Sequence, residues 1–171
     1  MKSRLGWLAC ATVLLAGCGT SGGPEATRDD GSQVDLGEHA RAWCGAEDAA
    51  SIAAGQPRAL HVVLGAFPPK GSKLRSYLYV SRRLSALRRS RVLTAGEDED
   101  FPTAYVFDAK TGNEVASNLN GAHGTVRFRT VTCKPGDEVR VLLDTVLVSE
   151  NGGGPPIHVR GELRAPIRGG Q

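Results

Sequence analysis

Two stretches near the C-terminus decide the fold: EVRVLLDTVLVS at Glu138–Ser149 and IHVRGELR at Ile157–Arg164. In the second stretch, Ile157, Val159 and Leu163 alternate with polar or charged residues, and the first stretch follows the same rule for most of its length. Successive side chains of a β-strand point to opposite faces of a sheet. The alternation therefore predicts two strands that each bury one face.

Five further runs have the composition of strands, and turn residues stand between most of them. They are Ala59–Phe67, Leu74–Val80, Thr103–Asp108, Glu114–Ser117 and Thr125–Cys133. About seven short strands at such spacing predict a mainly β fold, an antiparallel β-sandwich or barrel.

Two segments depart from the strand pattern. Residues 38–54 are rich in alanine and are followed by Gly55 and Pro57, which predicts one or two short N-terminal helices. Residues 81–93 (SRRLSALRRSRVL) fit either a short basic amphipathic helix or a basic hairpin between two edge strands, and the sequence does not decide between them.

The N-terminus has the composition of a secretory signal. Lys2 and Arg4 precede an apolar run from Leu5 to Ala16, which is too short to span a bilayer. The run ends in Leu15-Ala16-Gly17-Cys18, which resembles the lipobox of bacterial lipoprotein precursors.

This resemblance implies that the peptide is cut before Cys18 and that the Cys18 thiol carries the lipid that holds the protein on a membrane. In this class an aspartate after the cysteine retains the protein in the inner membrane. Gly19 stands there instead, so the expected location is the cell envelope, anchored in the outer membrane.

The chain then divides into three parts. Residues 1–17 form the signal peptide, residues 18–37 the lipidated cysteine with a polar, glycine-rich stretch expected to be a flexible tether, and residues 38–171 a single β-rich domain.

The chain has four cysteines. Cys10 lies in the signal peptide and Cys18 is the expected lipid site, which leaves Cys44 and Cys133 in a protein exported to an oxidising compartment. We expect these two to form a disulfide.

The net charge and the distribution of charged residues limit the kinds of partner that this protein is expected to bind. Removal of the signal takes Lys2 and Arg4 from the 21 basic residues and leaves 19 against 18 acidic ones, so nothing in the net charge favours nucleic-acid binding. The charges are nevertheless segregated, because nine basic and no acidic residues lie between Gly55 and Gly96.

Five arginines dominate that segment and form the candidate patch for an anionic partner. They are Arg82, Arg83, Arg88, Arg89 and Arg91. Anionic lipid, lipopolysaccharide and an acidic protein are the candidate partners, and a solvated charged face is the alternative interpretation.

No motif predicts a cofactor, a metal site or a catalytic group. The four histidines are scattered and form no metal-binding spacing. The sequence thus predicts a lipid-anchored, non-enzymatic binding or scaffolding module. The alternative is a periplasmic hydrolase with a loop-built site near His123, so whether the protein is an enzyme stays open.

Most aromatic residues fall in the expected strands, and we interpret them as core residues. They are Phe67, Tyr77, Tyr79, Tyr105, Phe107 and Phe128. This interpretation disfavours carbohydrate binding, which needs exposed rings, although an outward-facing Tyr77 or Tyr79 would favour it.

Overall fold

The structure is a computed structural model, and it describes residues 23–46, 58–65, 76–89, 92–94, 103–118, 121–149 and 154–169. The expectations for the signal peptide and for Cys18 concern residues outside these ranges. No helix within the described ranges is long and apolar enough to cross a membrane.

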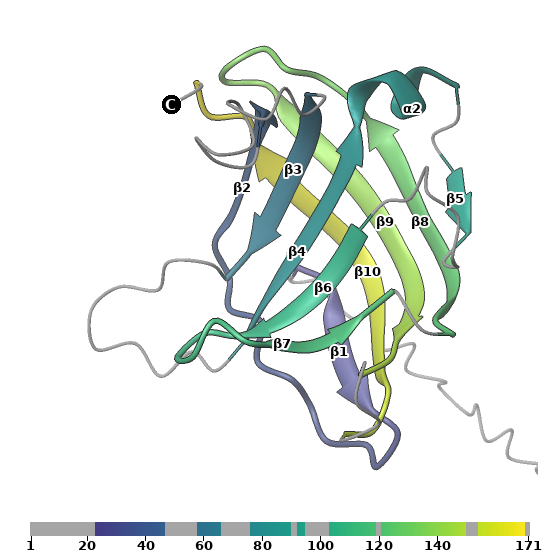
Figure 1. Ribbon diagram of the computed structural model, residues 1–171. Helices are drawn as coiled ribbons and strands as arrows, with labels where there is room; N and C mark the ends of the chain where they lie inside the picture. Colours follow the sequence, from purple (N-terminus) through teal and green to yellow (C-terminus); the bar gives the residue numbers. More distant parts are fainter. Residues whose placement is uncertain are drawn as a thin grey trace, which may run out of the picture.

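The described chain forms two antiparallel five-stranded sheets (Figure 1). The first sheet has the order β1 (Glu25–Arg28), β10 (Ile157–Pro166), β9 (Glu138–Leu147), β8 (His123–Thr130) and β5 (Val92–Thr94). The second has the order β2 (Ala40–Gly45), β3 (Ala59–Leu64), β4 (Ser76–Arg83), β6 (Thr103–Asp108) and β7 (Glu114–Ser117). The predicted antiparallel sandwich is confirmed, with ten described strands instead of about seven.

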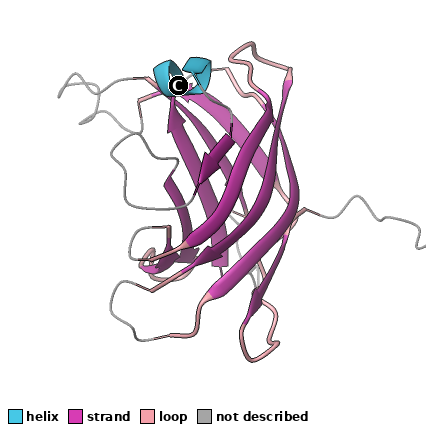
Figure 2. Ribbon diagram, turned by 90° about the vertical axis from the view of Figure 1, so that its right-hand side faces the viewer, coloured by secondary structure: helices cyan, strands magenta, loops and turns pink. Residues whose placement is uncertain are grey.

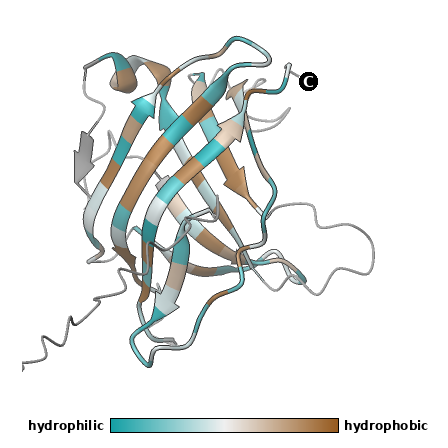
Figure 3. Cartoon of the chain, turned by 180° about the vertical axis from the view of Figure 1, so that it is seen from behind, coloured by the Kyte–Doolittle hydropathy of each residue, from teal (hydrophilic) through white to brown (hydrophobic). Residues whose placement is uncertain are grey.

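The core lies between the two sheets and follows the alternation that the sequence shows. On β9 every second residue from Val139 to Leu147 is buried, and on β10 the same holds for Ile157, Val159 and Leu163. The register places Val141 opposite Leu163. In Figure 3 these strands show hydrophobic and hydrophilic bands in alternation. Each fully buried aliphatic side chain stabilises the fold by about 1.5–3 kcal/mol.

The predicted N-terminal helix is wrong where the structure can test it. Ala40–Gly45 forms β2, which pairs with β3 from Ala40 opposite Leu64 to Gly45 opposite Ala59. Ala42 is fully buried in the core. Alanine favours helices only weakly, and strand pairing together with burial overrides that preference. Residues 47–57 lie outside the described ranges.

The predicted tether is also wrong from Gly23 onward. Residues 25–28 form β1 and pair with β10, from Glu25 opposite Arg160 to Arg28 opposite Ile157. Ala26, Val34 and Leu36 lie in the hydrophobic core. These three apolar residues are enough to seat a mostly polar segment on the sandwich, so residues 23–37 belong to the folded domain.

Residues 81–93 contain both a short helix and parts of two strands. β4 continues to Arg83, a short helix α2 (Leu84–Arg89) follows, and the chain returns as β5. The amide of Leu84 donates to the carbonyl oxygen of Arg58 at 3.0 Å, and Leu87 is buried in the core. The helix therefore covers one end of the sandwich (Figure 2).

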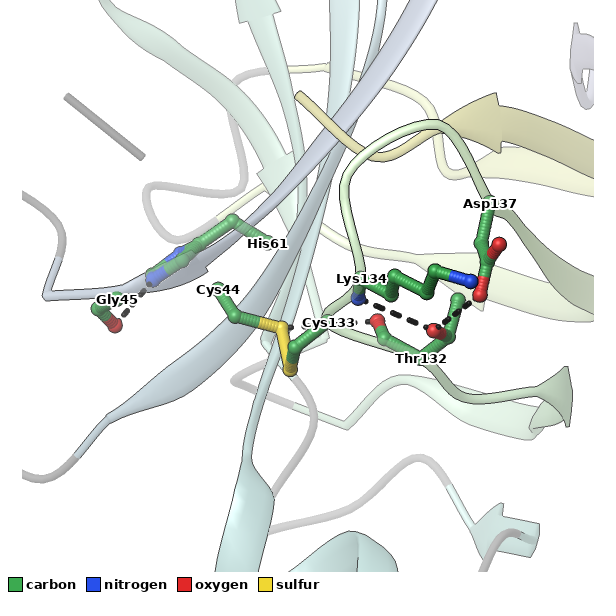
Figure 4. Close-up of a disulfide and its surroundings, with 7 residues drawn as sticks. All are labelled: Cys44, Gly45, His61, Thr132, Cys133, Lys134 and Asp137. Carbon is green, nitrogen blue, oxygen red and sulfur yellow. Dashed lines mark hydrogen bonds between the residues drawn. A yellow bond between two sulfur atoms is a disulfide. The ribbon is translucent and has the colours of Figure 1, made fainter. Parts of the chain in front are cut away.

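The two sheets are joined at their margins. An antiparallel bridge links Ser117 to Val148, and a parallel bridge links Ala42 to Ile167. The expected disulfide between Cys44 and Cys133 is confirmed, with the two Cα atoms 5.5 Å apart (Figure 4). It ties β2 of one sheet to the loop between β8 and β9 of the other.

Candidate anion-binding surface

The topology gathers cationic side chains from separate parts of the chain at one end of the sandwich. β4 ends here, β3 and β9 begin here, and β10 ends here, so α2, the β8–β9 loop and the C-terminal residues lie together (Figures 1 and 2). Five exposed cationic residues stand at this end: Arg58, Arg83, Arg88, Lys134 and Arg168. We call this set the basic end.

The structure divides the five arginines of the predicted patch. Arg83 and Arg88 are exposed at the basic end. Arg82 is only 7 % exposed, because on β4 it shares the inward parity of Leu78 and Val80. Arg82 is therefore not part of an exposed patch, which corrects the prediction. The backbone of Arg89 lies in α2, whereas its side chain and the whole of Arg91 are outside the described part of the structure.

The sequence reasoning missed two residues of the basic end. Lys134 lies in the β8–β9 turn, and Arg168 follows β10 in the chain. The backbone holds both regions together, since the amide of Ile167 donates to Asp137 O at 2.8 Å and the amide of Arg168 donates to Ala42 O at 2.8 Å. Knowledge of the β9–β10 pairing would have found them, because that pairing places the start of β9 beside the end of β10.

Charged groups of both signs lie near this end. Burial, and to a lesser degree the positive charge of Arg168, lower the pKa of Arg41. Of the nearby carboxylates, Asp137 accepts a hydrogen bond from Thr132 Oγ1 at 2.9 Å and Glu138 forms an ion pair with Arg140 at 2.8 Å. Figure 4 shows Thr132, Lys134 and Asp137 beside the disulfide.

The opposite end of the sandwich is acidic, and we call it the acidic end. It carries six carboxylates, four in the β1–β2 connection and two around the β6–β7 turn: Asp29, Asp30, Asp35, Glu38, Asp108 and Glu114. Arg28 and Lys110 are the described arginine and lysine there. Hydrogen bonds from the side chain and backbone of Ser32 lower the pKa of Asp30, and bonds from Thr111 and Lys110 lower that of Asp108. Among the described residues, charge is therefore separated along the length of the sandwich.

The outward face of the first sheet has mixed charge. Arg140 pairs with Glu138 at 2.8 Å, and Arg164 pairs with Glu162 at 2.6 Å. Arg160 lies 4.0 Å from a carboxylate oxygen of Asp144. Such exposed pairs contribute about 0–1 kcal/mol each, but they neutralise this face.

The aromatic residues correct another interpretation. Phe128 is a core residue, as expected. Tyr77, Tyr105 and Phe107 instead lie half-buried on the outward face of the second sheet, because the inward positions of β4 and β6 hold smaller aliphatic residues. Tyr79 has the same outward parity but is buried. Phe67 is outside the described ranges.

These rings stack on one another across the strands. The ring centroids of Tyr77 and Phe107 are 5.0 Å apart, and those of Trp43 and His61 are 4.9 Å apart. His61 Nδ1 lies 2.7 Å from the Tyr79 hydroxyl and Nε2 lies 3.2 Å from Gly45 O. A carbonyl can only accept, so Nε2 donates to Gly45 O, and Nδ1 shares a hydrogen bond with the tyrosine hydroxyl. These contacts brace neighbouring strands of the second sheet.

Among the described residues, His123 has no side-chain partner for catalysis. It is exposed at the start of β8, and its carbonyl oxygen accepts a hydrogen bond from Thr145 Oγ1 at 3.0 Å. In the described residues its imidazole makes no hydrogen bond, and no group of three or more potential metal ligands is present in those same ranges.

Comparisons with models of protein families, with curated proteins and with solved structures gave no match.

Proposed function

We propose that this chain is a lipid-anchored protein of the bacterial cell envelope, and that it acts as a non-enzymatic binding module whose basic end holds an anionic partner. The leader that resembles a lipobox supports the anchoring at Cys18 in the outer membrane. The Cys44–Cys133 disulfide is consistent with export, since disulfides persist in oxidising compartments.

One contrast carries the binding part of the proposal. On the outward face of the first sheet, Arg140, Arg160 and Arg164 lie within 4.0 Å of a carboxylate, although Arg127 and Arg129 on β8 form no ion pair in the described residues. By comparison, the five cationic residues of the basic end form no ion pair in the described part of the chain. A solvated charged face would be expected to interleave both signs. Unneutralised cations at one end are the arrangement that an anionic ligand completes.

Arginine also suits such a ligand chemically. Its planar guanidinium donates two parallel hydrogen bonds to a phosphate or carboxylate group, whereas lysine acts as a point charge. Four of the five residues of the basic end are arginines with exposed side chains. Arg58, Arg83 and Arg88 lie on or beside β3, β4 and α2, and Arg168 follows β10. The hydrolase alternative near His123 is not carried forward, because no observation favours it.

The anchoring is tested by mass spectrometry of the protein isolated from its own membranes. We expect a chain that begins at an acylated Cys18. A chain that retains Met1, or one that begins at unmodified Cys18, would contradict the anchoring.

The binding is tested with long-chain polyphosphate as the probe, by titration of the mature protein. We expect binding that weakens with salt. The double substitution R83E/R88E should weaken it by about tenfold or more, which corresponds to about 1.4 kcal/mol. The matched control R127E/R160E makes the same change in net charge on the outward face of the first sheet, and it should cost less than about threefold. Equal losses in both variants would show that only net charge matters, and no binding by the unsubstituted protein would reject the proposal.

A further inference from the structure

The chain enters the folded domain beside the middle of β10. In the register Glu25 lies opposite Arg160, and a Cβ added at Gly161 would be 3.1 Å from the Pro24 Cα atom. The backbone approaches Pro24 this closely because Gly161, with φ of 128°, carries no Cβ. Gly161 is the fifth of the ten residues of β10, which runs from the acidic end to the basic end. Both ends are therefore about equally far from the point where the chain enters the domain.

A short connection joins this point to the expected lipid site. Gly19 to Gly22 are the four residues between Cys18 and Gly23, and five steps of fully extended chain span at most about 18 Å. The ten residues of β9 give the sandwich a length of roughly 30 Å, so each end lies about 15 Å from the level of the attachment. A domain held in this way can lie along the membrane, with both ends open to neighbouring copies.

Most carboxylates of the acidic end lack a cationic partner in the described residues. Asp29 lies 2.8 Å from His158 Nε2, and the other five carboxylates form no ion pair in that part of the chain. Glu38 and Glu114 are exposed, and their side chains make no hydrogen bond within it either. This end therefore presents carboxylate oxygens that a cationic surface can bind.

The two ends of the sandwich have complementary charge among the described residues. The acidic end has six carboxylates and two cations. The basic end has five cations without an ion pair and two carboxylates, Asp137 and Glu138, of which Glu138 is paired with Arg140. Both surfaces are ends of the same pair of sheets, so they are similar in extent. Two basic ends or two acidic ends repel each other, whereas a basic end attracts an acidic end.

We propose that the anionic partner of the basic end is the acidic end of a second copy of this chain, so that anchored copies associate end to end along the membrane. This inference rests on the proposed function and specifies its partner. A contact between two different surfaces leaves one basic end and one acidic end open, so the association continues from copy to copy. Because each copy is attached at its middle, copies that repeat by translation along the sandwich keep every anchor on the same side.

Confinement to one membrane makes a weak contact sufficient. Exposed ion pairs are individually weak and are screened by salt. Copies anchored in the same bilayer, however, meet at an effective concentration far above that of molecules free in solution. The chain itself supplies both surfaces, so this partner is present wherever the protein is. An unrelated acidic protein has no such advantage, which favours a second copy as the occupant.

Cross-linking of the lipidated mature protein in phosphatidylcholine vesicles tests the end-to-end contact. The double variant Q33C/G169C carries one free thiol at each end, because Gln33 and Gly169 are exposed and the native Cys44 and Cys133 form a disulfide. With a flexible bismaleimide we expect a ladder of dimers, trimers and longer products that fades as salt is added. A mixture of Q33C and G169C should give dimers. Dimers that are as abundant with either single variant alone, or no ladder from the double variant, would overturn the inference.

Charge reversal separates a specific contact from a loss of folding. In the two-cysteine background, R83E/R88E at the basic end and E38K/E114K at the acidic end should each reduce the cross-linked fraction about tenfold. Each of these variants keeps one intact end, so an equal mixture of the two should form dimers again, which misfolded proteins could not do. Failure of the mixture to restore dimers would refute the inference.

The matched control R127E/R160E makes the same change in net charge as R83E/R88E and should leave the cross-linked fraction within about twofold. An equal loss in the control would mean that only net charge matters and would contradict the inference. The ladder should also persist in vesicles that contain phosphatidylglycerol. Its disappearance there would show that lipid headgroups occupy the basic end, which would again overturn the inference.

The two levels of the argument fail in different ways. If the protein is not acylated, or if it does not bind polyphosphate, the proposed function itself fails. If it is acylated and binds polyphosphate but gives no ladder, only the end-to-end association fails.

Discussion

Replacement of both Cys44 and Cys133 by serine should lower the free energy of unfolding by about 4–5 kcal/mol. The disulfide joins residues that are 89 positions apart, and in the chain-entropy model a closed loop of that size accounts for this value. Contacts of the two sulfur atoms contribute little beside it. Cys133 is exposed and Cys44 only half-buried, so the burial lost in the variant is worth less than about 1 kcal/mol. The loop term therefore dominates.

The measurement is urea denaturation of a soluble form that begins at Gly19. The variant should also show a steeper dependence on urea, because its unfolded chain is less compact and exposes more surface. Reduced wild-type protein serves as the control and should match the variant in both quantities. A loss below about 1 kcal/mol with an unchanged slope would refute the reasoning. It would mean that the disulfide does not restrict the unfolded chain.

Three further substitutions test the core, the seat of β1 and one turn. Gly161→Ala should cost about 2–4 kcal/mol and should speed hydrogen exchange of the β1 amides, whereas Gly154→Ala, which meets open space, should change stability by less than about 0.5 kcal/mol. Equal effects would remove the argument that Pro24 needs a glycine beside it. Leu143→Ala should cost about 3–4 kcal/mol in urea denaturation because Leu143 is fully buried; a loss near zero would place it outside the core. Asp108 has a folded-state pKa lowered from 3.8 by hydrogen bonds from Thr111 and Lys110, so its stabilisation is present above that value and is lost as the pH falls through the folded pKa. Asp108→Asn should therefore reduce the decline of the urea midpoint below about pH 4, and an unchanged decline would contradict this reading of the turn.

The strands with one polar face were predictable from sequence, and those buried on both faces were less so. β9 and β10 alternate for most of their length, and the structure confirms their inward residues. β3 reads ALHVVL, with His61 and Val63 buried although they lie on the outward parity of the strand. There the period of two no longer distinguishes the faces. The same ambiguity led to the assignment of Tyr77 and its neighbours to the core.

The N-terminal part shows a different limit. β1 has four residues, and its partner residues lie 129 to 135 positions later in the chain. No local sequence pattern predicts this pairing, because β1 is stabilised by its contacts with β10 and not by its own sequence. Ala26, Val34 and Leu36 were the available signal, but three scattered apolar residues do not outweigh a glycine-rich context.

The candidate site was predictable only in part, for the same reason. Arg83 and Arg88 stand in an evident run of arginines, and the alternation of β4 would have excluded Arg82 once the inward residues were known. Lys134 and Arg168 join the basic end through the topology of β8, β9 and β10. A surface assembled from distant segments depends on strand pairing, which the residue pattern of each strand does not specify.

The bridges from Ser117 to Val148 and from Ala42 to Ile167 have a consequence for contacts between copies of the protein. Unpaired strand edges recruit other strands and so seed aggregation. In the described chain, β7 and β2 are the edge strands of the second sheet, and one residue of each pairs with the opposite sheet. The edge strands of the first sheet, β1 and β5, have only four and three residues. Copies held at high density on one membrane would thus meet short or occupied edges, and neighbouring molecules could crowd together without merging their sheets.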